Sequence, residues 1–191
     1  MKETLRAGVK VVSAPQLFPT PPELAERVIA AADIRPGDRV LEPSAGTGAL
    51  LVALERYDCG EIVAVEINRD LCCGLWNVYA HVQTFCLDFL TTGIPGGHLL
   101  GPKGLFDRIV MNPPFADQQD IRHVMHAATF LKPGGRLVAI MSAGVTHRDD
   151  RLSRAFRGLL LERGGAIECL PEAAFQASGT GVRTVLVTIE G

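Results

Sequence analysis

Apolar residues in this chain follow two patterns that alternate along its length. Short continuous apolar runs predict buried strands, and apolar residues at helical spacing, such as Leu24, Val28 and Ile29, predict amphipathic helices. The strands are expected at about 39–42, 61–66, 82–86, 107–111, 136–141, 166–170 and 182–189. The helices are expected at about 21–32, 49–57, 69–79, 118–131 and 146–163. This order predicts an α/β fold, because strands separated by helical crossovers form a parallel sheet with helices on both faces.

The last two strands follow each other with a connection rich in Gly and Ser, which indicates antiparallel pairing. We therefore expect a doubly wound seven-stranded sheet, mostly parallel, with an antiparallel C-terminal strand. Local signals mark some element ends. The segment 20–23 (TPPE) matches a capping box with proline in the first turn, and Asn68 is a suitable helix cap. The segment 132–135 (KPGG) is expected to end the fourth helix.

The glycine-rich loop after the first strand predicts a cofactor site. Ligands of open parallel sheets bind beyond the carboxyl ends of the strands. Gly46 and Gly48 allow close approach of the backbone, but the third glycine of a dinucleotide-binding loop is missing. Glu42, just before this loop, would repel a pyrophosphate. A carboxylate there instead favours a ligand with a cationic ammonium or sulfonium group.

Acidic residues also end the next two strands. Glu66 stands where a ribose-binding acid is expected, since a carboxylate can accept from both ribose hydroxyls. Asp88 could accept a hydrogen bond from an adenine amino group, and Phe89 could offer an apolar face to the ring. Each residue also has a purely structural explanation: a solvated strand end for Glu66, a helix cap for Asp88 and core packing for Phe89. Their occurrence at successive strand ends strengthens the cofactor interpretation.

Six motifs together indicate a family: LEPSAGTGAL (41–50), VAVEIN (63–68), LDFL (87–90), MNPPF (111–115), FPTPPELAERVI (18–29) and FQASGTGVRTVLVTI (175–189). These motifs resemble those of class I S-adenosylmethionine-dependent methyltransferases. Within that class, the chain is most similar to the amino-methyltransferases that act on adenine in nucleic acid. The resemblance implies a Rossmann-like fold and S-adenosyl-L-methionine as cofactor. It implies cofactor contacts at Phe18, Thr20, Glu42, Ser44, Gly46, Glu66, Asp88, Phe89 and Asn112.

The tetrapeptide Asn112-Pro113-Pro114-Phe115 is the expected catalytic loop. An exocyclic aromatic amine is a poor nucleophile, because its lone pair is delocalised into the ring. The side-chain oxygen of Asn112 and the carbonyl of Pro113 could each accept one amino hydrogen and favour a pyramidal nitrogen. Phe115 would stack on the target base, which must first be flipped out of a duplex. The alternative is a rigid turn with a buried aromatic residue.

Composition and charge limit the classes of partner, metal site and cellular location that are expected. The 191 residues carry a net charge of −2, which argues against a strongly basic nucleic-acid binder. The five cysteines form no CxxC pair, so neither a zinc site nor a disulfide framework is expected. Residues 1–17 are interpreted as an N-terminal arm without signal-peptide features, and 18–191 as a single methyltransferase domain. No apolar run is long enough to span a bilayer, so a cytoplasmic protein with no membrane partner is expected.

Several substrates remain open. Arg148, Arg151, Arg154 and Arg157 recur every third residue and could follow a phosphate backbone, or could lie on a solvated helix. His123, His126 and His147 are interpreted as surface residues. The first hypothesis is adenine N6 methylation in nucleic acid, with DNA favoured over RNA. The others are methylation of a protein glutamine, and a cofactor-binding subunit whose partner supplies target recognition, since the sequence shows no separate recognition domain.

Overall fold

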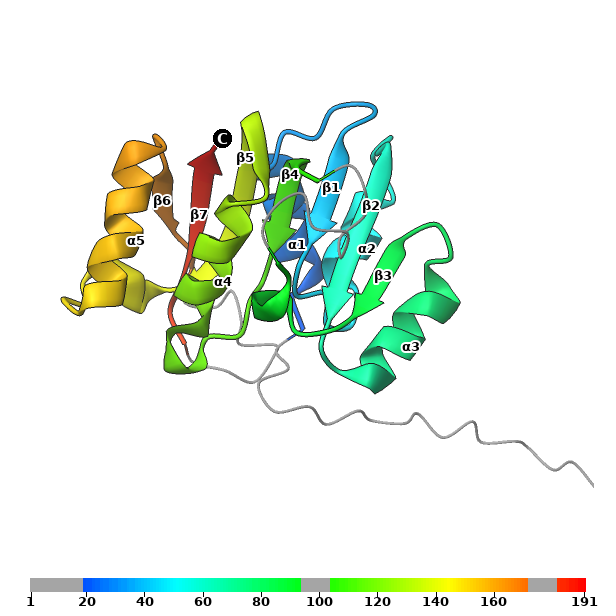
Figure 1. Cartoon of the computed structure of the whole chain (residues 1–191), viewed down its shortest axis with the longest axis horizontal. Helices are drawn as coiled ribbons and strands as arrows, with labels where there is room; N and C mark the ends of the chain where they lie inside the picture. The colour runs from blue at the N-terminus through cyan, green and yellow to red at the C-terminus, as the bar shows by residue number, and fades with distance from the viewer. Residues whose placement is uncertain (1–18, 94–103, 172–181) are drawn as a thin grey trace, which may run out of the picture.

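The computed structural model describes residues 19–93, 104–171 and 182–191. Within these ranges the strands form one seven-stranded sheet in the order β3-β2-β1-β4-β5-β7-β6, which is seen edge to edge in Figure 1. The strands are β1 (Arg39–Glu42), β2 (Glu61–Glu66), β3 (Gln83–Cys86), β4 (Phe106–Met111), β5 (Leu131–Ser142), β6 (Ala166–Cys169) and β7 (Thr184–Glu190). Strands β1 to β5 pair in parallel, and β7 lies antiparallel between β5 and β6. The predicted fold class, including the antiparallel C-terminal strand, is confirmed.

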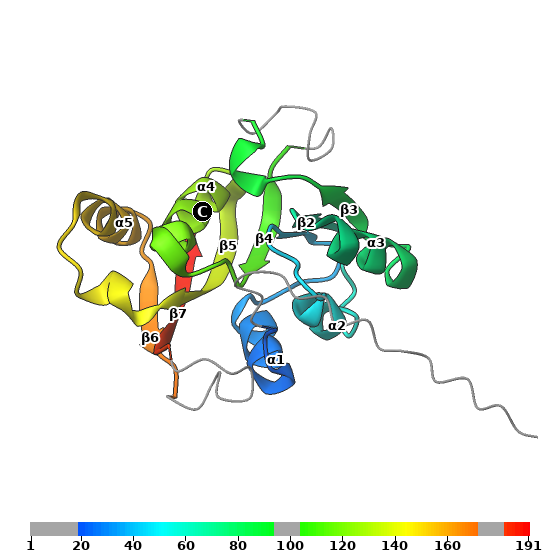
Figure 2. The same cartoon turned by 90° about the horizontal axis from the view of Figure 1, so that it is seen from below.

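Helices cover both faces of the sheet (Figure 2). They are α1 (Pro22–Ala31), α2 (Ala49–Leu54), α3 (Arg69–Val78), α4 (Gln119–Ala128) and α5 (Arg151–Glu162), with short 3-10 turns η1 (Phe89–Thr91), η3 (Ala116–Gln118) and η4 (Ala143–Thr146). Apolar residues of α1, α2 and α3 pack in one buried cluster, and those of α4 and α5 pack in another. Strands β1, β2, β4, β5 and β7 contribute to both clusters, because successive side chains of a strand point to opposite faces. Val40 thus belongs to the first cluster and Leu41 to the second.

The chain reverses its direction of winding between β1 and β4. It runs outward through β2 and β3, then returns to place β4 on the other side of β1. The carboxyl ends of these two neighbouring strands lead into Pro43–Gly48 and Asn112–Phe115. Open α/β sheets bind ligands at such a switch point. The topology thus brings the two motifs together, although more than sixty residues separate them in the sequence.

The predicted cap of α3 is confirmed, since the Asn68 side chain accepts from the backbone N–H groups of Asp70 and Leu71. The capping box predicted for α1 is wrong: Pro21 occupies the N-cap, with no side-chain cap bond, and the Thr20 hydroxyl instead accepts from Asn112 Nδ2 at 2.9 Å. A tertiary partner therefore replaces the local one.

The predicted starts of β5 and α5 also differ from the structure. Strand β5 begins at Leu131, which pairs with Phe106, and the KPGG segment lies inside it at a shift of register. Helix α5 begins at Arg151 rather than 146, because Asp150 caps its first turn by accepting from the N–H groups of Leu152 and Ser153. The residues before it form η4 instead.

Candidate active site

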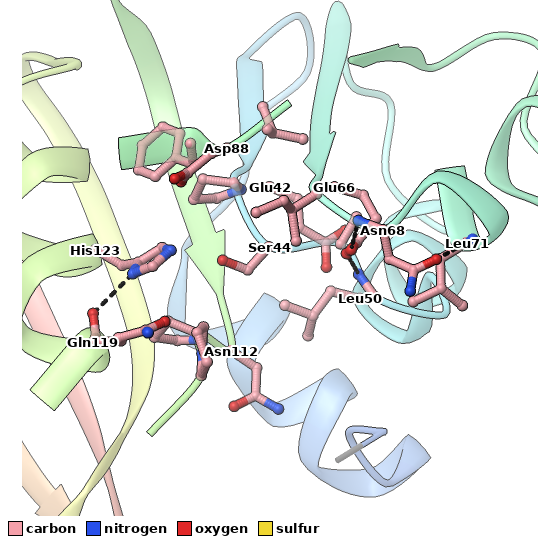
Figure 3. A pocket seen from close by; sticks show the side chains of 18 of the residues that line it. Glu42, Ser44, Leu50, Glu66, Asn68, Leu71, Asp88, Asn112, Gln119 and His123 are labelled. Atoms are coloured by element: carbon pink, nitrogen blue, oxygen red, sulfur yellow. Dashed lines mark hydrogen bonds between the residues drawn. The ribbon is translucent and has the colours of Figure 1, made fainter. Parts of the chain in front are cut away.

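A cavity of about 650 Å³ opens at the carboxyl ends of β1, β2, β3 and β4. This volume is within the usual range for small-molecule and cofactor sites. Figure 3 shows Gln119 and His123 of α4 on one side of it, and Asn68 and Leu71 at α3 on the other. The predicted residues that line it are Thr20, Glu42, Ser44, Gly46, Glu66, Asp88, Phe89, Asn112, Pro113, Pro114 and Phe115. Phe18, also predicted, lies outside the described residues.

Glu66 organises the floor of this cavity. Its Oε2 accepts from the N–H of Gly46 and its Oε1 from the N–H of Asn68, both at 2.7 Å. The Ala45 N–H donates to the carbonyl of Val65, which attaches the same loop to β2. The carboxylate thus fixes the glycine loop while each oxygen keeps a lone pair that can accept from a ligand hydroxyl.

Gly48 is required by its backbone and by its neighbours. Its φ of +85° is in the left-handed region, and a Cβ there would lie 2.9 Å from Leu75 Cδ2 and 3.0 Å from Tyr79 Cε2. The second glycine of the loop therefore serves the packing of the loop against α3.

We expect Gly48→Ala to lower the free energy of unfolding by about 2–3 kcal/mol, through left-handed strain and overpacking. Urea denaturation measures this. Gly74→Ala is the matched control, because Gly74 lies exposed within α3 with nothing within 4 Å of an added Cβ. It should stabilise the protein by about 0.5–1 kcal/mol. Equal effects of the two changes would contradict this account.

Glu42 is a buried acid next to a second acid. Only 1% of its surface is exposed, and Oε2 has no hydrogen-bond partner among the described residues. Burial, and then repulsion from Glu66, raise the pKa of Glu42 well above its ordinary value. A cationic ligand group in the cavity would offset both costs. The site therefore fits a ligand that carries an ammonium and a sulfonium group, together with a ribose for Glu66.

The raised pKa of Glu42 predicts a pH dependence of stability. Above the ordinary pKa of a glutamate, the folded protein retains a proton that the unfolded chain has lost. The free energy of unfolding should therefore fall as pH rises from that ordinary pKa to the raised one, and should level off above it. One proton limits the slope to about 1.4 kcal/mol per pH unit. Urea denaturation without cofactor from about pH 5 to 8 should show this decline in the wild type but not in Glu42→Gln. Parallel curves would contradict the assignment.

The residues that follow β3 line the part of the cavity next to α4. The Asp88 side chain caps η1 by accepting from the Leu90 N–H at 2.9 Å. Phe89 is 2% exposed and packs on the rings of His126 and Phe130, with centroids 4.8 and 5.7 Å away. Both residues therefore fill the structural roles considered from sequence, and both also line the cavity.

The loop after β4 connects the cavity to α4. Asn112 donates from Nδ2 to Thr20 Oγ1, so Oδ1 is the amide atom that can accept. Pro113 is buried, and Phe115 is half-buried and packs against the cluster shared with α1 and α2.

The turn that follows has two successive non-glycine residues in the left-handed region, Asp117 at φ 53° and Gln118 at φ 57°. Such strain persists only where the surroundings hold it. Here Gln118 Nε2 donates to Asp150 Oδ2 at 2.8 Å, which ties the turn to the cap of α5.

The structure corrects the prediction for one histidine and shows that the arginine row, which the sequence left open, is largely solvated. His123 is 8% exposed and lines the cavity, so interpreting it as a surface residue was wrong. In the arginine row, Arg157 donates to the carbonyls of Val145 and Arg148, and Arg154 pairs with Asp149 at 3.2 Å. Arg148 and Arg151 are exposed.

Arg122 is an exposed cation at the cavity that the sequence analysis did not single out. Its position one residue before His123 on α4 is the signal that could have found it, once α4 was known to border the cavity.

Comparison with known proteins identifies the class. A family model described as "Methyltransferase domain" matches residues 18–175, which is more than half of the chain. The chain therefore belongs to this methyltransferase family. The family agrees with the class of S-adenosyl-L-methionine-dependent methyltransferases that the sequence predicted, and the chain spans only part of the length of the relatives it matches.

Individual proteins resemble part or nearly all of the chain. It is 44% identical over 64 residues to ribosomal RNA small subunit methyltransferase A of Synechococcus elongatus, a match over 34% of this chain and 23% of that protein. Its structure resembles the M protein of the type I restriction enzyme EcoKI, with a TM-score of 0.73, 20% identity and coverage of 94% of this chain and 45% of that one. It also resembles a class I S-adenosylmethionine-dependent methyltransferase of Listeria monocytogenes, with a TM-score of 0.67, 17% identity and coverage of 96% and 64%. These structural likenesses show the fold.

Proposed function

We propose that this protein transfers a methyl group to the exocyclic amino nitrogen of adenine in a nucleic acid. The observation that carries the proposal is the position of Asn112-Pro113-Pro114-Phe115 at the cofactor cavity, directly beside the switch point of the sheet. The amide oxygen of Asn112 and the carbonyl of Pro113 accept hydrogen bonds, and neither group is a general base or a nucleophile. That set suits an NH2 group, which presents two hydrogens in one plane.

Residues of the chain would bind the cofactor and orient the target amino group. When bound, S-adenosyl-L-methionine supplies an electrophilic methyl group on a positively charged sulfur. Glu42 would face its cationic end and Glu66 its ribose. Asn112, held by Thr20 through Nδ2, would accept one amino hydrogen of the target and Pro113 the other. These bonds would favour a pyramidal nitrogen, whose lone pair is localised and can point at the methyl group instead of being delocalised into the ring.

Alignment of the reacting atoms supplies much of the expected rate, since well-oriented pairs gain up to roughly 7–11 kcal/mol. No general base is required, because the methylated nitrogen is acidic enough to lose its proton to water. Phe115 and Pro114 border the space where the base would stack. This role for Phe115 is compatible with its partial burial, which leaves part of the ring accessible.

The polymer is the open part of the proposal. DNA is the substrate that the sequence motifs favour. RNA is the second candidate, because the matching cyanobacterial relative is named for ribosomal RNA. The exposed cations Arg122, Arg148 and Arg151 support a phosphate-bearing partner in either case, since lysines and arginines dominate backbone contacts.

Target recognition by a partner subunit is also proposed, and the M protein that the chain resembles belongs to a type I restriction enzyme. We also propose that residues 18–191 act as a single methyltransferase domain; the predicted arm at 1–17 lies outside the described residues. Among the described residues no helix is long and apolar enough to cross a membrane. The five cysteines are free thiols, which agrees with the proposed cytoplasmic location.

A methyl-transfer assay tests the proposal. Radiolabelled cofactor is incubated with the full chain and, separately, unmethylated duplex DNA, transcribed RNA and a mixed protein fraction. Label recovered as N6-methyladenine in DNA or RNA supports the proposal and decides the polymer. Label in protein alone would favour a glutamine target and overturn it. Cofactor binding with no label in any fraction would indicate a subunit that needs its partner.

A further inference from the structure

His123 presents a defined hydrogen-bond acceptor inside the cofactor cavity. It lies within α4 and is 8% exposed. Its Nδ1 is 2.8 Å from the carbonyl of Gln119, an oxygen that can only accept. Nδ1 must therefore carry the ring proton, which leaves Nε2 with a lone pair. Figure 3 shows the imidazole directed into the cavity, with Gln119 at its back.

A second acceptor belongs to the same end of the cavity. Asp88 and His123 both line it and lie close enough to interact electrostatically. Asp88 accepts from Leu90 through Oδ1, so Oδ2 can serve a ligand. Phe89 follows Asp88 in the sequence, and its ring packs beside the His123 ring with centroids 6.1 Å apart. Two acceptors thus line the same end of the cavity beside the edge of the Phe89 ring, and the structure shows no ion pair to Asp88 among the described residues.

We propose that His123 is a specificity-determining residue that accepts, beside Asp88, a hydrogen bond from the exocyclic amino group of the cofactor's adenine. An amino group has two hydrogens, and one carboxylate oxygen and one imidazole nitrogen match them. A 6-oxo purine places an acceptor at that position and would face two acceptors. The inference concerns the cofactor, so it stands apart from the nature of the methyl acceptor.

The protonation state of His123 agrees with this role. Burial lowers the pKa of its imidazole, while Gln119, Asp88 and Asp120 act in the opposite sense and His126 adds to the lowering. The net effect is a neutral ring at neutral pH. Only the neutral ring can accept through Nε2.

Binding of two product-like ligands tests the proposal without any methyl transfer. The affinity of the full chain is measured by calorimetry for S-adenosylhomocysteine and for S-inosylhomocysteine, which carries the 6-oxo group. The wild type should prefer the adenosyl ligand. His123→Phe keeps an aromatic ring but has no acceptor, and should weaken adenosyl binding by about 3- to 10-fold while leaving inosyl binding unchanged or improved. His123→Gln, which restores an acceptor oxygen, should keep most of the preference.

His126→Phe is the matched control. His126 is on the same helix and packs on Phe89 at 4.8 Å, but it is not among the residues that line the cavity. It should leave the preference between the ligands intact. Equal loss of both ligands in His123→Phe would reduce His123 to a packing residue and overturn the proposal, as would an unchanged preference. His123→Met, also without an imidazole acceptor, replaces the Phe variant if that fails to fold.

Discussion

Asn112→Ala is expected to slow methyl transfer by about a hundredfold to a thousandfold, the usual loss when one preorganised polar group is removed from a reaction centre. Cofactor affinity should stay almost unchanged. The change removes the acceptor for one amino hydrogen, so the target nitrogen keeps its lone pair in the ring. It also removes the donor to Thr20, which orients the amide at 2.9 Å.

The measurement is single-turnover methyl transfer to the best acceptor found above, with binding of S-adenosylhomocysteine measured in parallel. Thr20→Val gives a graded comparison, because it keeps the Asn112 amide but deletes its hydroxyl partner. An intermediate loss of rate is expected from it. Full activity in Asn112→Ala would refute the role of the loop, and a large loss of cofactor affinity would make Asn112 a cofactor ligand first.

Glu66→Ala should weaken cofactor binding by about a hundredfold, since hydrogen bonds to a charged group contribute about 1.5–3 kcal/mol each. The change removes the proposed ribose acceptor. It also removes the Glu66 carboxylate oxygens to which the N–H groups of Gly46 and Asn68 donate, each at 2.7 Å. The glycine loop should therefore loosen, and the free energy of unfolding should fall as well.

A control variant on the same strand distinguishes a loss of cofactor binding from a loss of stability. Glu61 lies at the opposite end of β2 and pairs with Arg39 at 2.7 Å, far from the cavity lining. Glu61→Gln should lower the free energy of unfolding yet leave the cofactor affinity of the folded protein intact. Calorimetry and urea denaturation on both variants give the comparison. Unchanged affinity in Glu66→Ala would rule out the ribose assignment.

Elements whose pattern is local were predictable from the sequence. Strands β1 and β2 occupy the expected residues, because each is a short apolar run between turn residues. Asn68 caps α3 as expected, since the donors of a cap lie two and three residues away. The alternation of strands and helices was enough to predict a mostly parallel sheet.

Predictions failed where a distant residue competes for a local group. Thr20 does not cap α1, because Asn112, 92 positions away, donates to its hydroxyl. Strand β5 begins early because Phe106 of β4 provides a partner for Leu131. His123 was assigned to the surface because the helical face it occupies depends on where α4 packs.

The sequence by itself therefore determined the elements, their order and the residue types of the site, since strand ends and turns depend on neighbours along the chain. Only the tertiary structure decided which side chains share the cavity, that Glu42 is buried beside Glu66, and that His123 faces inward. The physical reason is distance along the chain: burial and long-range hydrogen bonds depend on packing between segments that periodicity does not relate.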